Sequence, residues 1–256
     1  MAGAEIRLLG PLEVLLGGRP VELPGRRVRT LLVLLALGGG RIVTFERLAA
    51  GIWDETPPVH VRGSLQTYVG RLRRVLGEEM IVTDPSGYRL SVPPVWVDAV
   101  EFRRLVQEAE ECTVPSDQRQ LLQAALALWP DGPTGEALTE WLRRYESPGL
   151  VERYLWAFER RVDLDLATGR HPALVSEVRA LTDRFPLRET LWARLLRALQ
   201  VSGRRAEALD RYEELRSRLS SELGVDPSAE LQTIQRGLLR DARRVGDDGG
   251  EPASRR

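Results

Sequence analysis

Residues 61–76 carry side chains that can recognise a nucleic acid. With 100° between successive residues, Leu65, Val69, Leu72 and Leu76 fall on one side of a helix, which predicts a buried stripe. The other side then presents Gly63, Ser64, Gln66, Thr67, Gly70, Arg71 and Arg74. Gln and Thr can hydrogen-bond to base edges, and Arg can pair with guanine or with phosphate. The pattern predicts a helix that reads the major groove of DNA.

The positive charge of this segment is local. Residues 60–76 include four arginines and no acidic residue. The whole chain is formally neutral, with 37 basic residues, all of them arginine, and 37 acidic ones. A neutral total does not exclude a nucleic-acid partner, because the local basic face governs binding. The alternative is that these arginines only form a helix face that is exposed to water, but the lack of an acidic partner within the segment favours DNA.

The segments before this helix are expected to support it. Short apolar runs broken by Gly and Pro predict strands at residues 6–9, 12–15 and 21–23. Residues 27–37 are rich in Leu and Val and predict a buried helix. Thr44 can cap a second helix that ends near Trp53. Pro57 and Pro58 then separate this helix from the third.

A β-hairpin is expected directly after the third helix. Gly77 ends that helix, and apolar runs at 80–83 and 88–92 flank a turn at 84–87. Three helices followed by a hairpin are the plan of a winged helix-turn-helix, in which the third helix enters the major groove and the wing lies on the backbone.

Further residues of this region are predicted to contact DNA. The wing can reach phosphate or the minor groove, although any exposed turn favours the same residue types. The start of the first helix can hold a phosphate with help from the helix dipole, although its arginines can equally border a buried helix. These additional candidates are Arg62, Tyr68, Arg73, Thr83, Arg89, Arg26 and Arg27.

The second half of the chain is expected to be helical. Pro93 and Pro94 mark a boundary, and Asp98 with Glu101 has the spacing of a capping box. Gly169 and Gly203 lie 34 residues apart with matching apolar flanks, which is the tetratricopeptide period. The aromatic residues of this part are expected to form core rather than a ligand cage: Trp129, Trp141, Trp156, Trp192 and Tyr212.

The remaining sequence favours no catalytic, metal or membrane function. Cys112 is the one cysteine, and His60 and His171 are isolated from each other. The chain has no nucleotide-binding, serine hydrolase or zinc-protease motif, so we expect neither an enzyme nor a cofactor or metal. No apolar run reaches the roughly 18 residues of a membrane span, and the N-terminus lacks a signal-peptide pattern. We expect a cytoplasmic, nucleoid-associated protein with no membrane partner.

Several segments resemble the Streptomyces antibiotic regulatory protein (SARP) family. They are residues 9–14, 63–77, 81–83, 87–90, 169–171, 186–192, 203–209 and 222–228. The resemblance covers about residues 5–240 and implies a mainly α fold with a small β component. An OmpR-type winged-helix DNA-binding domain is expected at 1–94, an all-α, tetratricopeptide-like bacterial transcriptional activation domain at 95–241, and a disordered tail at 242–256.

The resemblance also implies a function. Such proteins bind tandem direct repeats of double-stranded promoter DNA and recruit the RNA polymerase holoenzyme, including its sigma factor, to activate secondary-metabolite (often antibiotic) gene clusters. Direct repeats imply a head-to-tail dimer on DNA. Gly70 replaces a serine that many relatives carry, and the 84–86 wing tip is more acidic than usual. Because no receiver or sensor module is expected, abundance rather than phosphorylation would control activity.

The rival hypothesis is a tetratricopeptide-type adaptor whose basic N-terminal module docks on an acidic protein. It explains the helical repeats equally well. It does not explain the hairpin or the acid-free third helix.

Overall fold

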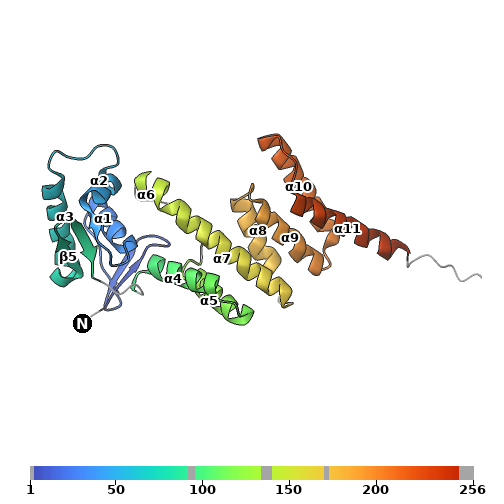
Figure 1. Cartoon of the computed structure of the whole chain (residues 1–256), viewed down its shortest axis with the longest axis horizontal. Coiled ribbons are helices and arrows are strands. Elements are labelled where there is room, and N and C mark those ends of the chain that lie inside the picture. The colour runs from blue at the N-terminus through green and yellow to red at the C-terminus, as the bar shows by residue number, and fades with distance from the viewer. Residues whose placement is uncertain (1–2, 92–95, 134–139, 170–172, 248–256) are drawn as a thin grey trace, which may run out of the picture. The chain divides into compact units, whose positions relative to one another are not determined.

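The computed structural model describes residues 3–91, 96–133, 140–169 and 173–247, and it is mainly helical with small sheets (Figure 1). The expected fold class is therefore confirmed. The structure divides into two compact units, residues 1–158 and 159–256. The first unit holds both sheets and the helices up to the first half of α7, and the second holds the remaining helices.

The N-terminal sheet is a small antiparallel meander. It pairs β1 (Ala4–Arg7) with β2 (Glu13–Leu16) and β2 with β3 (Arg19–Pro20). Ile6 lies opposite Val14, and both side chains are buried. The third strand was expected at 21–23, but the turn through Gly17 and Gly18, both at positive φ, reverses the chain tightly enough that β3 begins at Arg19.

Three helices and a second sheet form the winged helix-turn-helix region. The helices are α1 (Arg26–Leu37), α2 (Phe45–Trp53) and α3 (Val61–Leu76). The sheet has the order β4 (Val43–Thr44), β6 (Gly87–Leu90), β5 (Ile81–Asp84), and a 3₁₀ turn at Glu78–Met80 joins α3 to β5. The expected helices and hairpin are confirmed.

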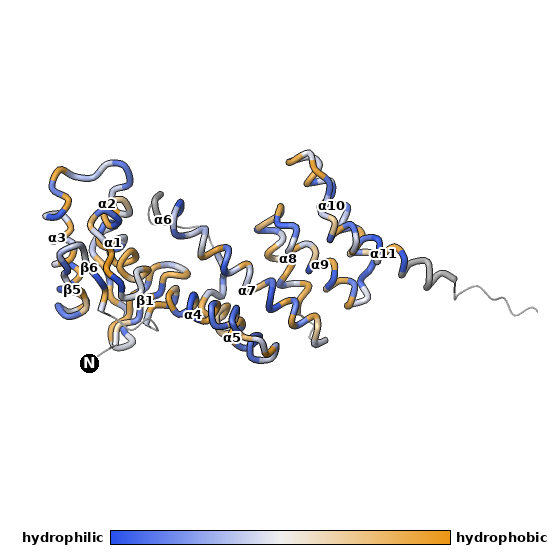
Figure 2. Tube along the Cα trace, viewed as in Figure 1, coloured by the Kyte–Doolittle hydropathy of each residue, from blue (hydrophilic) through white to orange (hydrophobic). Residues whose placement is uncertain are grey.

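The core of this region is α1, which Figure 2 draws mostly in the hydrophobic colour. Leu31, Leu32 and Leu35 are fully buried, so this helix packs on all sides, as its continuous apolar run predicts. Thr44 caps α2 by accepting a hydrogen bond from the backbone N–H of Arg47. Gly87 allows β6 to approach β4, because a Cβ there would lie 2.0 Å from the carbonyl oxygen of Val43.

The rest of the chain is a series of helices. In chain order they are α4 (Asp98–Glu111), α5 (Pro115–Ala127), α6 (Glu140–Tyr145), α7 (Ser147–Ala167), α8 (Leu174–Arg184), α9 (Glu189–Val201), α10 (Arg205–Leu223) and α11 (Ala229–Asp247). Helix α4 packs on α5, and α9 packs on α8, α10 and α11. Helix α11 extends six residues into the tail that was expected to begin at 242, while residues 248–256 lie outside the described ranges.

The 34-residue repeat is visible in the backbone. Gly169 has φ 74° and Gly203 has φ 73°, and each lies in a turn between helices where only a left-handed conformation continues the chain. Among the aromatic residues expected to be core, Trp129, Trp192 and Tyr212 are buried, whereas Trp156 is half-buried. The side chain of Trp141 lies outside the described part.

Asp98 does not form the expected capping box. Its carboxylate accepts hydrogen bonds from the backbone N–H groups of Leu8 (2.7 Å) and Leu9 (3.0 Å), just after β1, and from that of Ala99 (2.6 Å). Glu101 instead pairs with Arg104. Burial raises the pKa of Asp98, although the three N–H groups that donate to its carboxylate act to lower it. Asp98 thus joins the start of α4 to the N-terminal sheet.

Candidate nucleic-acid interface

Helix α3 is anchored by one face and open on the other. Leu65 and Leu72 are fully buried, and Val69 and Leu76 are at most 7% exposed. These side chains hold α3 against α1 and α2. The opposite face is solvent-accessible along its length, as the 100° periodicity predicts.

The accessible face of α3 presents unpaired polar side chains. Gln66, Arg71 and Arg74 are exposed and make no hydrogen bond or ion pair with any residue that the structure describes. A Cβ placed at Gly63 or Gly70 would meet no atom within 4 Å, so the surface beside them is open. This face can approach a groove closely and still offer donors and acceptors to it.

Two other residues of this face, Thr67 and Ser64, are less available than these three. The hydroxyl of Thr67 donates to the carbonyl of Gly63 at 3.0 Å, which leaves its lone pairs available as acceptors. Ser64 is half-buried. Both remain on the predicted DNA-facing side.

Arg73 and Thr83 bind each other. The guanidinium of Arg73 donates to the carbonyl of Ile81 (2.8 Å) and to the hydroxyl of Thr83 (2.9 Å), and it lies 3.6 Å from Glu78. Both residues were expected to contact DNA. In the structure the pair ties α3 to the first strand of the wing, and its contact with DNA stays a prediction.

Arg62 and Tyr68 rest on aromatic rings. The guanidinium of Arg62 lies 4.8 Å from the ring centroid of Phe45, and Tyr68 packs on Trp53 with ring centroids 6.0 Å apart. The hydroxyl of Tyr68 accepts a hydrogen bond from Arg27 at 3.5 Å. These contacts hold both side chains at the edge of the predicted DNA-facing side.

The start of α1 is also basic and exposed. Arg26 and Arg27 line a small cavity of 280 Å³ between α1 and the end of α2, together with Thr30 and Trp53. Gly25 caps the helix without a side chain, at φ 82°. Backbone N–H groups and two guanidinium groups at a helix start can bind a phosphate.

The wing tip is closed by Asp84. Its carboxylate accepts the backbone N–H of Ser86 at 2.9 Å and the Ser86 hydroxyl at 2.6 Å, and these bonds lower the pKa of Asp84. Arg89 is half-buried on the next strand. A carboxylate at the tip repels phosphate, so Arg89 is the basic group of the wing best placed to compensate it.

A cluster that sequence reasoning missed links the winged-helix region to later helices. Glu146 accepts a hydrogen bond from Arg47 of α2 and lies 3.6 Å from Arg103 of α4. Arg103 also donates to the carbonyl of Leu37 at 3.3 Å, and burial lowers its pKa. Arg47 and Glu146 lie 99 positions apart. No local spacing in the sequence could have signalled this pairing.

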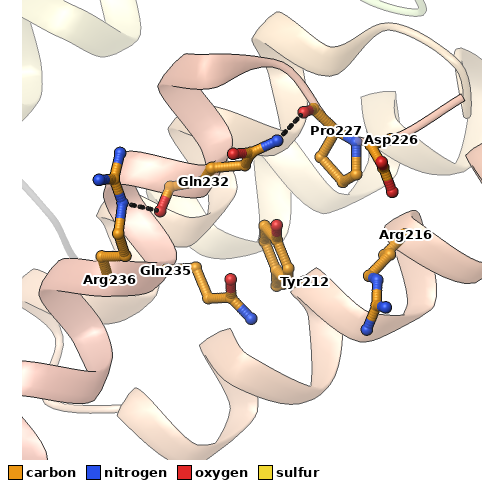
Figure 3. Close-up of a pocket in the computed structure, with 7 residues that line it drawn as sticks. All are labelled: Tyr212, Arg216, Asp226, Pro227, Gln232, Gln235 and Arg236. Carbon is orange, nitrogen blue, oxygen red and sulfur yellow. Dashed lines mark hydrogen bonds between the residues drawn. The ribbon is translucent and has the colours of Figure 1, made fainter.

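The second unit contains a polar pocket between α10 and α11 (Figure 3). Tyr212 lies at its centre, and burial raises the pKa of this phenol. The amide of Gln232 donates to the carbonyl of Pro227, and Arg236 donates to the carbonyl of Gln232. The pocket measures 270 Å³, below the ~300 Å³ of small ligand sites. Both hydrogen bonds lie within α11 and the loop before it, whereas the amide of Gln235 donates to Glu213 of α10 at 3.3 Å.

The described residues contain no group of three or more His, Cys, Asp or Glu side chains able to hold a metal ion. No helix in the same part of the chain is long and apolar enough to cross a membrane.

Two family models match the chain. The bacterial transcriptional activator domain matches residues 97–239, and the model described as "Transcriptional regulatory protein, C terminal" matches residues 18–90. The regulatory protein AfsR of Streptomyces griseus is 36% identical over 252 residues, which are 96% of this chain and 26% of AfsR. The regulatory protein DnrI of Streptomyces peucetius is 34% identical over 250 residues, which are 92% of each chain.

A solved structure is also similar. The structure of Mycobacterium tuberculosis EmbR in complex with a low affinity phosphopeptide has a TM-score of 0.81 and 30% sequence identity, and the match covers 94% of this chain and 66% of that one. The present chain thus spans almost the whole length of DnrI but only about a quarter of AfsR.

Proposed function

Because this chain belongs to the Streptomyces antibiotic regulatory protein family of transcriptional regulators, we propose that it activates a secondary-metabolite gene cluster, such as one for an antibiotic. It binds tandem direct repeats upstream of promoters and recruits the RNA polymerase holoenzyme with its sigma factor. Residues 1–94 bind the DNA, and residues 95–241 act as the activation domain. The protein works in the cytoplasm, at the nucleoid.

The exposed face of α3 carries this proposal. Its buried stripe fixes the helix, while Gln66, Arg71 and Arg74 extend from it without partners among the described residues. Gln66 and Arg71 read base edges in the major groove. The residues that neutralise phosphates around it are Arg74, Arg62, Arg26, Arg27 and Arg89. If about four phosphates are neutralised per subunit, log K falls with log salt at a slope near −3.6.

Direct repeats place two copies in the same orientation. The contact between them is therefore heterologous, with a different surface used on each copy. A dimer forms on the DNA in this way, and the helical second half supplies part of the contact.

Polymerase is recruited by surfaces outside the DNA-facing side. Val59, in the loop between α2 and α3, is 94% exposed and follows two prolines that stiffen the loop (Figure 1). An apolar side chain held in solvent beside the DNA-reading helix suits a protein contact. The helical repeats offer the larger surface.

Fluorescence anisotropy with the full chain tests the DNA-binding step. Labelled promoter fragments are titrated with scrambled competitor DNA at two salt concentrations. We expect binding that survives the competitor and weakens with salt. Arg71→Ala should cost roughly 1–3 kcal/mol and relax specificity at one base pair if the guanidinium grips a base. Arg240→Ala, an exposed arginine on α11, is the matched control and should bind as the wild type does.

Charge reversal separates this proposal from the adaptor hypothesis. Arg71→Glu together with Arg74→Glu should abolish promoter binding and transcription from a reconstituted promoter. A protein that still activates with both reversals, or that prefers no promoter over scrambled DNA, does not read DNA through α3.

A further inference from the structure

Phe45, the first residue of α2, contacts two elements that are predicted to bind DNA. The guanidinium carbon of Arg62, in the first turn of α3, lies 4.8 Å from the centroid of the Phe45 ring. Tyr88, on the second strand of the wing, packs against the same ring at a right angle, with ring centroids 5.6 Å apart. One half-buried side chain therefore joins the start of α3 to the wing.

The position of the Phe45 ring is set by the wing. The backbone N–H of Phe45 donates to the carbonyl of Ser86, in the wing turn, at 3.1 Å. The two residues before it form β4, which pairs with β6 at Gly87 and Tyr88. The side chain of Tyr88 is only 3% exposed. Phe45 thus extends from a backbone that is bound to the wing, and it packs on a ring that is held in the core.

The side chain of Arg62 has the Phe45 ring as its main support. It is exposed, and it makes no hydrogen bond or ion pair within the described part of the chain. The negative face of an aromatic ring attracts a guanidinium, and at exposed sites it favours the stacked position about two- to fivefold. A side chain that is already restricted loses less freedom when it binds a phosphate, so the ring should raise the affinity for DNA.

The N-terminus of α2 is not itself suited to a phosphate. The N–H of Phe45 is bound to Ser86, and Glu46 places a negative charge in the first turn. Hydrogen bonds from its own backbone N–H and from Thr44 lower the pKa of Glu46, and the charge of Arg62 also lowers it. The group that this surface offers to a phosphate is therefore Arg62 rather than the helix start. Because Glu46 attracts Arg62, it is the alternative to Phe45 as the group that places the guanidinium.

We propose that Phe45 is a positioning residue for DNA binding: its ring, fixed to the wing, holds the guanidinium of Arg62 where it binds a phosphate beside the major groove. This role rests on the proposed function, because Arg62 is assigned to DNA only there. Phe45 acts through Arg62 and makes no contact with a base. The phosphate contact at the start of α3 is thereby kept in register with the wing.

A fluorinated phenylalanine tests the ring face with little change of shape. 3,4,5-Trifluorophenylalanine, placed at position 45 of the full chain by stop-codon suppression, has less electron density on its face and so attracts a guanidinium more weakly. Fluorescence anisotropy with promoter DNA should show binding about threefold weaker. In the Arg62→Ala background the same fluorination should leave the affinity unchanged, because the guanidinium is no longer present on the ring.

The salt dependence of binding separates positioning from charge. Arg62→Ala should reduce the salt slope by about one, because one phosphate contact is lost. Fluorination at Phe45 should lower the affinity and leave the slope unchanged, since the guanidinium is still there to neutralise the phosphate. A merely structural role of the ring would not make its effect depend on Arg62.

Two further variants serve as controls. Fluorination of Phe185, a half-buried phenylalanine of the second unit with no guanidinium over its ring in the described structure, should not change DNA binding. Glu46→Gln should keep the threefold difference between the fluorinated and unfluorinated proteins, because the ring still holds Arg62. Loss of that difference in Glu46→Gln would assign the position of Arg62 to Glu46 instead.

The outcomes distinguish this role from the proposed function. A wild-type protein that prefers no promoter over scrambled DNA would overturn both. If the wild type binds its promoter, three results would each overturn the role of Phe45 alone: an affinity unchanged by fluorination, an equal loss in Arg62→Ala or at Phe185, or an unchanged salt slope in Arg62→Ala. Base reading by the exposed face of α3 would then still stand.

Discussion

Neighbouring arginines on α3 have different roles because they point in different directions around the helix. Arg74 is exposed and has no partner among the described residues, whereas the side chain of Arg73 is 24% exposed and bound to the wing. One residue of separation is a rotation of 100°, which takes a side chain from the solvent to β5. The run of arginines in the sequence therefore does not describe a uniform DNA-binding surface.

This difference predicts opposite phenotypes for the two alanine variants. Arg73→Ala should lower the free energy of unfolding by about 1.5–3 kcal/mol, because the carbonyl of Ile81 and the hydroxyl of Thr83 lose a charged donor. It should leave the salt slope of DNA binding unchanged. Arg74→Ala should change stability by less than about 0.5 kcal/mol and reduce the salt slope by about one.

Urea denaturation and anisotropy at several salt concentrations measure both quantities on each variant. A reduced salt slope for Arg73→Ala at unchanged stability would show that its guanidinium neutralises a phosphate. In that case the bonds to β5 would have to break on DNA.

Asp84 allows a test of the wing by pH. Hydrogen bonds from Ser86 hold the pKa of this carboxyl below its ordinary value, so the ionised form is favoured in the folded state. The contribution of this carboxylate to the free energy of unfolding is therefore present above the unfolded-state pKa of about 3.9, and it is lost as pH falls through the folded-state pKa. The wing turn should loosen only in acid.

A carbon-detected NMR titration of the Asp84 carboxyl measures this pKa directly. Ser86→Ala should raise it, since the hydroxyl donor at 2.6 Å is removed while the backbone donor remains. Ser91→Ala, on a serine outside the turn, serves as the control. An unchanged pKa in Ser86→Ala would mean that the backbone N–H alone sets it.

At the scale of elements, the sequence was most informative where structure is local. The cap at Thr44, the stripe from Leu65 to Leu76 and the hairpin turn each depend on residues within a few positions, and all three were predicted. The 34-residue repeat of glycines was likewise readable, because each glycine terminates a helix for its own steric reason.

Elements joined over long sequence distances were not predictable in this way. Asp98 satisfies the rule for a capping box, yet its carboxylate binds backbone groups some 90 positions earlier, because packing brings β1 to the start of α4. In the sequence Arg73 is likewise only one more basic residue of the helix, and its bond to the carbonyl of Ile81 becomes visible only when the position of β5 is known. The periodicity therefore predicted which side of α3 is exposed, but it did not distinguish Arg73, which is bound to β5, from Arg71 and Arg74, which are exposed. DNA binding by this side stays a prediction.

The hydrogen bonds of Asp98 predict that replacing Asp98 and replacing Glu101 change stability by different amounts. In a capping box the two residues would contribute about equally. Asp98→Ala leaves the N–H groups of Leu8 and Leu9 without an acceptor and should lower the free energy of unfolding by about 2 kcal/mol. Glu101→Gln removes a surface ion pair with Arg104 and should cost less than about 1 kcal/mol.

Urea denaturation of the full chain measures the free energy of unfolding of Asp98→Ala and of Glu101→Gln. Equal losses in the two variants would indicate that the helix cap, rather than the link to the N-terminal sheet, determines the stability of this region.

At the scale of the molecule, the two ways of dividing the chain differ. The matched family models, at 18–90 and 97–239, meet near the boundary expected from Pro93 and Pro94. The compact units instead meet at residue 158, because α4 and the segment around Glu146 pack on the winged-helix region. Sequence composition marks where one type of structure changes to another, whereas compactness depends on contacts that composition does not encode.

The two divisions predict different behaviour for fragments. A fragment of residues 1–94 lacks the carboxylate of Asp98, the guanidinium of Arg103 on the carbonyl of Leu37, and the pairing of Glu146 with Arg47. It should therefore unfold at a lower urea concentration than a fragment of residues 1–158, which keeps all three. Arg47 and Leu37 lie on α2 and at the end of α1, so these contacts stabilise the helices that support α3.

Glu146 provides the internal control for this comparison. Glu146→Gln in the longer fragment should lower the free energy of unfolding by about 1 kcal/mol, because the carboxylate that faces Arg47 and Arg103 becomes neutral. The urea concentration at which this fragment unfolds should then approach that of the shorter fragment. If both fragments unfold at the same urea concentration, the winged helix is stable alone. The helices from α4 onwards would then serve activation without stabilising the DNA-binding domain. A more stable long fragment would mean that changes around Glu146 can affect how firmly α3 is held, although Glu146 and its two arginine partners lie outside α3.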